Sequence, residues 1–540
     1  MSNNSPLQKV EFLNVLNQLA PREYVNFTKC FPFDNDKEQE AVSHLQRCVD
    51  DCVQQNPHLA GTIVSIPRTP QQDVLARTLV DPTGEHSRVI IDARWPSSFF
   101  TSGGNRVALN YGELRASGFS PGLFFDDVFA PMGDPAAAAL AAGDDGESDS
   151  SSVPILLPRV VFIPGGLLLG VFMHHAMADG VVATALIDDL AARSRGVKRE
   201  SLPRKGYLPK SQYLPLGQLS AALEQHRCDL HETQGLSSEE TVTEILPEWT
   251  TITNATAFSN TAKINFSIKN SLPVNQSPRV GKIFHVSKAR IEELRETLAQ
   301  SANKPASKPP STFVTLMALV WSYVAKARMR AVGVADWSAL HERGKNKTSN
   351  TADDSNEGDM AAQSCVVAAW HPSIKGRGRG FSQETLDAID DFCGNMAICP
   401  IATLPTTQLL WQAADSSPTQ TDKGAHAQKE ALAAIAAPLT QLINSLDADF
   451  IRQRPALLET LPDVGALAMN YDFEAPQNVF FNSHRYLAGA DTEWDIPGLI
   501  LDDNDDGDGT AAPEVAVAGG VASPRSSARA GRPGGRVPSW

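Results

Sequence analysis

The chain has 540 residues, which is enough for two or more domains with large apolar cores. It is acidic, with 62 Asp and Glu residues against 47 Lys and Arg residues, and its basic residues form no stripe with interleaved aromatic residues, so nucleic acid is excluded as the expected partner. Because the first residues lack a basic segment leading into an apolar run, and no apolar run of membrane-spanning length occurs, we expect neither a signal peptide nor a membrane span, and we expect a cytoplasmic protein.

Seven cysteines are scattered along the chain. Cys48 and Cys52 are four residues apart, and Cys393 and Cys399 flank a glycine, but no second pair of ligands completes a zinc spacing. An odd, dispersed set of this kind is typical of reduced, buried thiols. We therefore predict neither a disulfide framework nor a metal site.

The first predicted elements lie between residues 37 and 93. Apolar residues at helical spacing from Ala41 to Val53 predict an amphipathic helix that ends at Asn56 and Pro57. Residues 61–67 and 87–93 are apolar and β-branched and predict strands. Residues 133–152 are small, acidic and free of aromatic side chains, which is typical of a solvated insertion.

Residues 159–175, "RVVFIPGGLLLGVFMHH", predict two apolar strands joined by a turn at Pro164 and Gly165. The next residues, 181–196, carry apolar side chains at helical spacing and end in Gly196, which predicts a helix with a glycine stop. The sequence "HHAMADG", residues 174–180, therefore lies where a strand leads into a helix.

The second part of the chain alternates predicted helices and strands. Residues 197–250 are rich in Pro, Lys and Gln and suit a long crossover. Helices are predicted at 290–304, at 311–331 with a cap at Ser311 or Thr312, and at 425–446. Strands are predicted at 365–370 and 395–404, and residues 341–363 read as a polar insertion.

These elements give a division of the chain into four parts. We predict an N-terminal domain over residues 1–196, a crossover linker over 197–261 and a C-terminal domain over 262–500. The tail, 501–540, consists of an acidic run followed by Ala, Gly, Ser, Pro and Arg, and we predict that it is disordered.

The pair His174–His175 followed by Asp179 and Gly180 carries recognisable chemistry. An imidazole has an unperturbed pKa near 6.5, so a buried histidine at a strand end is a free base that accepts a proton from a hydroxyl. The positive end of the helix that starts near Gly180 also disfavours the imidazolium form. A carboxylate at Asp179 is placed to cap that helix or to pair with an arginine, and we assign it to holding the loop.

Two other interpretations of the histidine pair remain open. Adjacent histidines at a strand end can be ordinary core residues. A metal site is disfavoured, because neighbouring residues of a strand point to opposite faces and cannot easily bind one ion. For the same reason only one histidine faces a given side, and we assign His175 as the base and His174 as its structural neighbour.

The motif "HHAMADG" resembles the active-site motif of the BAHD-type acyltransferases. The stretch "FPFDND…AVSHLQRCVDDCVQQNPHLAGTI" resembles the fungal branch with the trichothecene acetyltransferases, and "STFVTLMALVWSYVAKARMRA" and "DFCGNMAICPIATLP" are also similar to the family. The similarity covers residues from about 20 to 500. It implies an α/β fold of two chloramphenicol-acetyltransferase-like domains with a channel between them.

The resemblance also implies roles for single residues. His175 would be the general base and Asp179 its structural partner, and Ser483 or Asn482, in "FFNSHRYL", would donate to the oxyanion of the tetrahedral intermediate. Members usually carry an Asp-Phe-Gly-Trp-Gly motif that supports the channel, and this chain has only "TEWDIPG", with Trp494 as the supporting residue. Because the final strands of the family are replaced by the tail, we interpret the C-terminus as the result of a truncated or frame-shifted gene model.

The co-substrate implied by the resemblance is acyl-CoA, in particular acetyl-CoA, with no permanently bound cofactor. An anionic donor needs a local basic patch, and the glycine-rich "SIKGRGRGF" offers Lys375, Arg377 and Arg379 for its phosphates. A solvated loop without a ligand is the alternative interpretation of those residues.

The function indicated by the sequence is transfer of an acyl group, in particular acetyl, to a hydroxyl of a small metabolite by a monomeric enzyme. Two alternatives stay open. One is a condensation-domain-like enzyme that forms amides, which is disfavoured because no carrier domain adjoins. The other is a non-catalytic binding protein on the same fold, suggested by the altered C-terminal motif.

Overall fold

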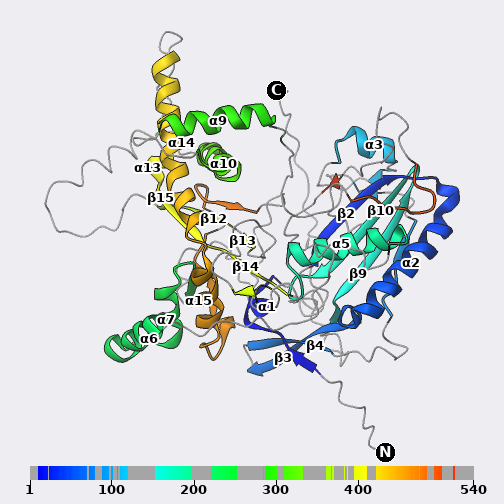
Figure 1. Ribbon diagram of the computed structural model, residues 1–540, viewed down its shortest axis with the longest axis horizontal. Coiled ribbons are helices and arrows are strands. Elements are labelled where there is room, and N and C mark those ends of the chain that lie inside the picture. The colour runs from blue at the N-terminus through cyan, green and yellow to red at the C-terminus, as the bar shows by residue number, and fades with distance from the viewer. Residues whose placement is uncertain are drawn as a thin grey trace, which may run out of the picture.

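The structure is a computed structural model of the chain. It describes residues 10–21, 24–69, 72–78, 88–95, 99–100, 106–107, 110–119, 152–197, 221–251, 284, 286–301, 309–331, 361–366, 368–369, 382–383, 386, 394–409, 421–472, 475–482, 492–500 and 515–516. We call the described residues up to 197 the N-terminal half and those from 221 the C-terminal half, and Figure 1 shows helices and strands mixed in both.

A five-stranded sheet with the order β18-β2-β10-β9-β5 forms the centre of the N-terminal half. Strand β10 (Gly166–His174) lies antiparallel between β2 (Tyr24–Pro32) and β9 (Leu156–Ile163), and all of its residues are buried. The predicted turn between β9 and β10 is confirmed at Pro164 and Gly165. Gly165 has a φ of +73°, so proline fixes the first turn position and glycine takes the left-handed second one.

Two helices cover one face of this sheet, α2 (Glu38–Gln55) and α5 (Gly180–Ser194), and they pack against each other. Both were predicted, and α5 is followed by Gly196 at a φ of +69°, as the glycine stop requires. We call the apolar cluster between helices and sheet the N-terminal core; its fully buried members include Cys52, Met173 and Leu186.

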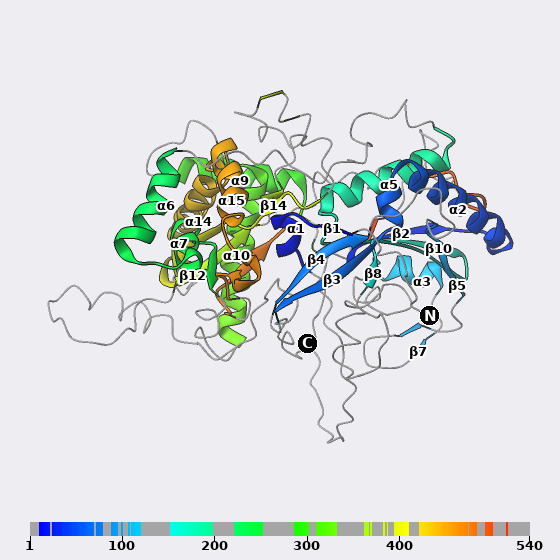
Figure 2. The same ribbon diagram turned by 90° about the horizontal axis from the view of Figure 1, so that it is seen from below.

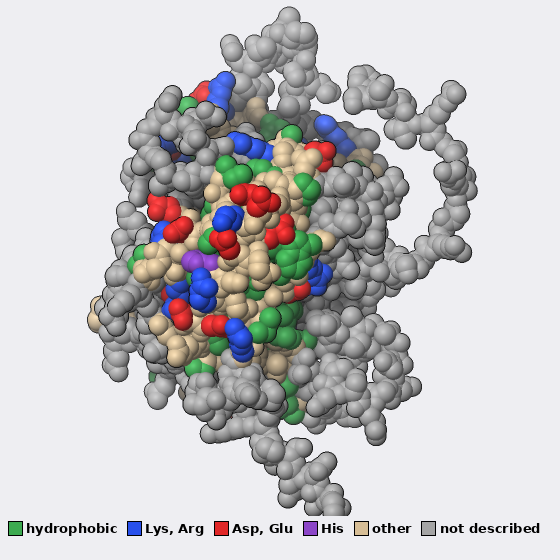
Figure 3. Space-filling view, turned by 90° about the vertical axis from the view of Figure 1, so that its right-hand side faces the viewer, with side chains coloured by type: hydrophobic (Ala, Val, Ile, Leu, Met, Phe, Trp, Pro, Cys, Tyr) green, Lys and Arg blue, Asp and Glu red, His purple; other side chains and the backbone are tan. Residues whose placement is uncertain are grey.

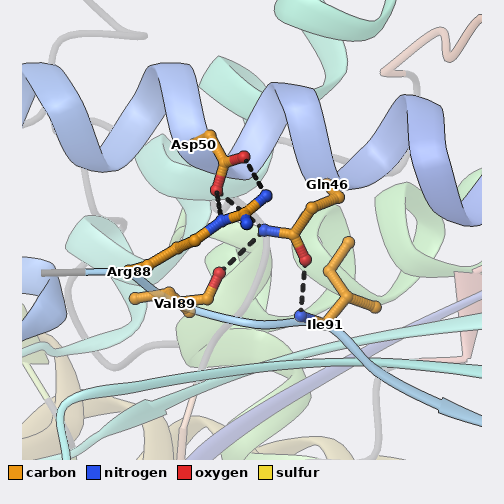
Figure 4. A network of polar contacts seen from close by, with 5 residues as sticks. All are labelled: Gln46, Asp50, Arg88, Val89 and Ile91. Carbon is orange, nitrogen blue, oxygen red and sulfur yellow. Dashed lines mark hydrogen bonds and ion pairs between the residues drawn. The ribbon is translucent and has the colours of Figure 1, made fainter. Parts of the chain in front are cut away.

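Strand β5 (Asp92–Arg94) runs parallel to β9 at the sheet edge and is shorter than the strand predicted over 87–93. Figure 4 shows the reason. The side chain of Gln46 donates to the carbonyl of Val89 at 2.8 Å and accepts from the N–H of Ile91 at 2.9 Å, so an amide on α2 takes the place of a strand partner. Arg88 adds two hydrogen bonds to Asp50 at 3.1 and 2.8 Å.

A second sheet of the N-terminal half has the order β1-β4-β3-β8. Its strands are β1 (Val10–Phe12), β3 (Thr62–Thr69), β4 (Gln72–Thr78) and β8 (Ser152–Pro154), and β3 confirms the strand predicted over 61–67. The short elements of this half are α3 (Tyr111–Ala116), β6 (Phe99–Phe100) and β7 (Arg106–Val107).

In the C-terminal half, three helices pack against a three-stranded sheet. The helices are α9 (Lys288–Ser301), α10 (Thr312–Ala331) and α14 (Thr421–Asn444), all three predicted. The sheet has the order β15-β12-β17 (Ile401–Pro405, Ala361–Val366 and Val479–Phe481). Trp321 is fully buried at the centre of this C-terminal core and donates its indole N–H to the carbonyl of Gln477 at 2.9 Å.

Strand β12 begins at Ala361, so the polar insertion predicted over 341–363 is wrong for its last three residues, which pair with β15 through their backbones. The other short elements here are α13 (Thr406–Leu409), β13 (Ala368–Ala369) and β14 (Ala397–Ile398).

The predicted crossover contains regular structure. Helix α6 (Ala221–Gln234) and helix α7 (Ser238–Ile245) precede β11 (Trp249–Thr251), which pairs with β16 (Leu467–Met469). Helix α7 starts with a capping box, in which the side chains of Ser237 and Glu240 each accept from the other residue's N–H. Together with α15 (Ala448–Leu458), these elements build what we call the third core.

Two segments pack in the half to which they do not belong by sequence. Helix α1 (Val15–Leu19) buries Leu16 and Leu19 in the third core, against α15. Residues 492–500 pack on the N-terminal core, where Trp494 and Ile496 are buried and Leu499 bridges to Phe33 at the end of β2. Figures 1 and 2 show α1 close to α15.

Part of the predicted disordered tail is a strand. Val515 and Ala516 form β18 and pair antiparallel with Lys29 and Thr28 of β2. An edge strand presents backbone N–H and C=O groups to a further strand, and here a short apolar stretch pairs with them. The other residues from 501 onward lie outside the described ranges.

The side of the molecule shown in Figure 3 carries acidic and basic side chains that lie interspersed. Surface ion pairs that involve α2 residues, such as Lys37–Glu40 at 2.8 Å and Arg88–Asp50 at 2.8 Å, likewise combine charges of opposite sign. Within the ranges that the structure describes, no helix is both long and apolar enough to cross a membrane.

Candidate active site

The motif "HHAMADG" lies at the junction that the sequence predicts. His174 is the last residue of β10, a turn follows, and Gly180 is the first residue of α5 with Asp179 as its N-cap. The buried strand and the packed helix thus hold the loop from both sides.

The side chain of His174 is buried in the protein interior. Its side chain is 1% exposed, and its Nδ1 accepts a hydrogen bond from the N–H of Ala176 at 3.2 Å. Its ring meets that of Tyr24 edge-on, with 5.5 Å between centroids, and its backbone N–H donates to Ile155 at 2.9 Å. These contacts fit a packing role.

His175 is partly exposed and contacts a different part of the chain. Its Nδ1 lies 3.0 Å from Oδ1 of Asn395, which belongs to the C-terminal half. Desolvation lowers the pKa of His175, although its own backbone, the charge of Asp179 and the hydrogen bond to Asn395 act in the opposite direction. The side chain therefore carries a neutral imidazole at neutral pH.

Asp179 is buried and directs both carboxylate oxygens at backbone N–H groups. Oδ1 accepts from Val181 at 2.9 Å and from Val182 at 3.2 Å, which caps α5. Oδ2 accepts from the N–H of Met396 at 3.0 Å, in the C-terminal half. The carboxylate thus holds the loop, and it also ties the two halves together.

Asn395 is the centre of these contacts, and the sequence did not single it out. Its Nδ2 donates to the carbonyl of His175 at 2.5 Å and to Oδ1 of Asn17 at 3.1 Å, and its N–H donates to the same Oδ1 at 2.7 Å. The only signal was its place in "DFCGNMAICP", directly after a glycine and before a strand. Asn17 had a weaker signal, as a polar residue among the apolar ones of "FLNVLNQLA".

The remaining predicted site residues lie elsewhere or outside the described ranges. Trp494 packs on Phe31, and the N–H of the next residue, Asp495, donates to Ser194 at the last turn of α5. A 15-residue helix is about 22 Å long, so Trp494 is remote from His175 and acts on the N-terminal core. Asn482 follows β17 and is exposed; Ser483, Lys375, Arg377 and Arg379 lie outside the described residues.

Two family models match the sequence. Residues 24–193 match the Trichothecene 3-O-acetyltransferase-like N-terminal domain, and residues 127–335 match the Transferase family. The acyltransferase easC of Emericella nidulans is 23% identical over 61% of this chain, and the eremophilane O-acetyltransferase prx11 of Penicillium rubens is 24% identical over 35%. The matched stretches span 60% and 36% of the lengths of those two relatives.

Solved structures with the same fold include TRI101 of F. graminearum with ethyl coenzyme A and TRI101 of F. sporotrichioides with coenzyme A and T-2. The first matches with a TM-score of 0.54 at 16% identity, over 91% of this chain and 87% of that one. The second matches with a TM-score of 0.53 at 14% identity, over 90% and 86%. The predicted fold class, an α/β fold with two chloramphenicol-acetyltransferase-like domains, is confirmed; the channel between them stays a prediction.

Proposed function

This chain belongs to the BAHD-type acyltransferases, and from that premise we propose that it transfers an acyl group from acyl-CoA to a hydroxyl group of a small molecule. The observation that carries the proposal is the state of His175. It is a neutral, partly exposed imidazole whose Nδ1 is occupied by Asn395, so Nε2 is the nitrogen available to an acceptor.

The reaction follows from this arrangement. Nε2 of His175 takes the proton of the acceptor hydroxyl while the oxygen attacks the thioester carbonyl, and a tetrahedral oxyanion forms. The C–S bond then breaks, the ester is released, and the CoA thiolate takes the proton back from the imidazolium. A side chain after β17, either Ser483 or Asn482, donates to the oxyanion in this proposal.

The names of the relatives support acyl-CoA and a small acceptor. They include an eremophilane O-acetyltransferase, and the TRI101 structures contain coenzyme A with T-2 or deoxynivalenol. By analogy we propose acetyl-CoA as the donor and a small, rather apolar metabolite as the acceptor. We assign Lys375, Arg377 and Arg379 to the CoA phosphates, so neutralising all three should weaken CoA binding.

The test is an acyl-transfer assay with labelled acetyl-CoA and a panel of alcohols and amines, run with the parent, His175→Ala and His231→Ala. Loss of the general base should lower the rate by about 10²–10⁴-fold in His175→Ala. His231 is exposed on α6, so His231→Ala should keep the parental rate. An active His175→Ala enzyme contradicts the mechanism, and transfer to amines alone points to the amide-forming alternative.

A parent that binds acetyl-CoA but transfers nothing supports the remaining alternative, a binding protein. Binding is measured by calorimetry on the same preparation, so the two outcomes are separable.

A further inference from the structure

We propose that Asn395 and Asn17 act as positioning residues that fix the tautomer of His175, with the proton on Nδ1 and the lone pair on Nε2. The proposal deepens the function above, because it rests on His175 as the base. It starts from four contacts that join three distant parts of the chain: α1, the end of β10 and the segment before β14.

The backbone carbonyl of His175 determines which way the side-chain amide of Asn395 is turned. The carbonyl oxygen of His175 can only accept, so the atom of Asn395 that faces it at 2.5 Å is the Nδ2 amine. The amide oxygen of Asn395 is consequently turned to Nδ1 of His175, at 3.0 Å. An amide oxygen only accepts, so Nδ1 carries the proton.

The backbone N–H of Asn395 leads independently to the same orientation of the Asn395 amide. The backbone N–H of Asn395 can only donate, so the atom of Asn17 that it meets at 2.7 Å is Oδ1. The same Oδ1 lies 3.1 Å from the side-chain amide of Asn395. Because this oxygen only accepts, the atom of Asn395 that faces it is again Nδ2. Asn17 therefore prevents the amide of Asn395 from turning over.

The tautomer decides whether the imidazole can act. A neutral imidazole has one N–H, so a proton on Nδ1 leaves the lone pair on Nε2. Asn395 contacts Nδ1 and leaves Nε2 accessible to an acceptor hydroxyl. With the proton on Nε2, the lone pair would face Asn395 and would be closed to an acceptor hydroxyl. A neutral amide fixes this choice without the charge of a carboxylate, because Asp179 directs its oxygens to backbone N–H groups instead.

The burial of Asn17 favours a role beyond packing. Its side chain is 0% exposed, between Leu16 and Leu19 of the third core, and its Nδ2 has no hydrogen-bond partner among the described residues. A buried amine without a partner is unfavourable for stability, so an apolar residue would suit the core better. What Asn17 provides in return is one oxygen that accepts twice from Asn395.

The test compares Asn17→Leu with Asn14→Ala. Asn17→Leu removes the oxygen that holds Asn395, whereas Asn14→Ala removes the N-cap of the same helix, where Asn14 accepts from the N–H of Asn17 at 3.0 Å. Both variants change α1, but only Asn17→Leu removes a contact to Asn395. We expect kcat to fall by about 10²-fold in Asn17→Leu, with KM for acetyl-CoA unchanged, because general-base assistance is worth about 10²–10⁴-fold. Asn14→Ala should lower the melting temperature and keep kcat.

A direct readout is nitrogen-15 spectroscopy of the protein labelled in its histidine rings, with His175→Ala used to assign the signal of His175. We expect Nδ1 to be pyrrole-like and Nε2 pyridine-like in the parent, and a mixture of the two forms in Asn17→Leu. A parent with the proton on Nε2 overturns the inference. An unchanged tautomer together with an unchanged kcat in Asn17→Leu overturns the role of Asn17.

The spectrum does not depend on turnover. If the parent transfers no acyl group but shows the proton on Nδ1, the proposed function fails while the assignment of the tautomer stands.

Discussion

His174 and His175 are neighbours in sequence and opposites in environment. His174 offers its Nδ1 to an N–H of its own loop, whereas Nδ1 of His175 meets an amide oxygen from the other half of the molecule. The first arrangement needs a lone pair on Nδ1 and the second needs a proton there. One ring is thus part of the interior, and the other is the ring that we propose as the base.

The lowered pKa of His175 predicts a pH dependence of both rate and stability. Since the base must be neutral, kcat/KM should fall only below an apparent pKa that lies under the ordinary 6.5. The unfolded chain binds the proton more tightly than the folded one. The stability from this group is therefore complete above about pH 6.5 and is lost as the pH falls toward the lowered folded pKa.

The measurement is a pH profile of kcat/KM, together with urea unfolding between pH 5 and 8, for the parent and for His175→Ala. The variant should lack the part of the pH-dependent stability that belongs to this group. An acid limb of kcat/KM above pH 7 would contradict the assignment.

How far the sequence predicts single residues depends on whether their partners are local. The place of His175 and Asp179 at a strand-to-helix junction was predictable, because the motif and both elements lie within one stretch. Asn17 and Asn395 are 378 residues apart and meet only in the folded chain. No periodicity or spacing reports such a contact.

At the scale of elements, the N-terminus of α5 has two functions. Asp179 uses one oxygen to cap the helix and the other to hold the N–H of Met396. A helix cap is local, but the bond to Met396 crosses between the halves. The start of this helix is therefore also a connection beside the site.

We predict that Asp179→Asn lowers both the melting temperature and the rate of acyl transfer. Asparagine has one acceptor oxygen where aspartate has two, so either the cap or the N–H of Met396 loses its partner, at roughly 1–3 kcal/mol. The matched control is Asp447→Asn, because Asp447 caps α15 through the N–H of Phe450 at 2.8 Å. The control should keep its stability within a few tenths of a kcal/mol and its activity in full. Equal losses in both variants would contradict the second function of Asp179.

A buried ion pair connects α15 to the residues before β11. Nε of Arg454 lies 2.6 Å from Oε1 of Glu248, and both residues are buried. Arg454→Met should lower the free energy of unfolding by about 3–5 kcal/mol, because it leaves a carboxylate buried without its partner. The double variant with Glu248→Gln should recover part of that loss in urea unfolding. A double variant less stable than Arg454→Met would show that the cost does not come from the unpaired charge.

At the scale of the whole molecule, residues 492–500 are part of the N-terminal core. Thr492 donates to Asp188 at 2.7 Å, Gly498 accepts from the N–H of Asp34 at 2.8 Å, and Ile500 donates to Pro32 at 3.1 Å. These bonds tie the segment to α5 and to the end of β2, far from His175. Its departure from the family motif thus concerns the stability of one half.

We predict that Trp494→Ala lowers the free energy of unfolding by about 3–5 kcal/mol, as expected for a buried tryptophan. Ile500→Ala is the matched control, because this side chain in the same segment is 47% exposed and should cost much less. Both are compared by urea unfolding, with acetyl-CoA binding as a second readout. A small effect of Trp494→Ala would contradict the structural role of this segment.

The sequence predicted elements better than their assembly. Continuous apolar patterns gave α2, α5, α10 and the β9–β10 hairpin correctly, since each depends on its own residues. Strand β5 came out short because Gln46, from a helix, takes the hydrogen bonds of Val89 and Ile91. Helix α1 packs in the C-terminal half and residues 492–500 pack in the N-terminal half. This was not predictable, because an apolar pattern shows that a segment is buried but not against which core it packs.

The place of residues 492–500 has a consequence for biosynthesis. Trp494 and Leu499, which contact Phe31 and Phe33, are synthesised several hundred residues after them. At about 5–20 residues per second, a nascent chain waits tens of seconds for these partners. During that interval the end of β2 exposes aromatic surface, so the nascent protein should depend on chaperones that bind such surface until residues 492–500 emerge from the ribosome.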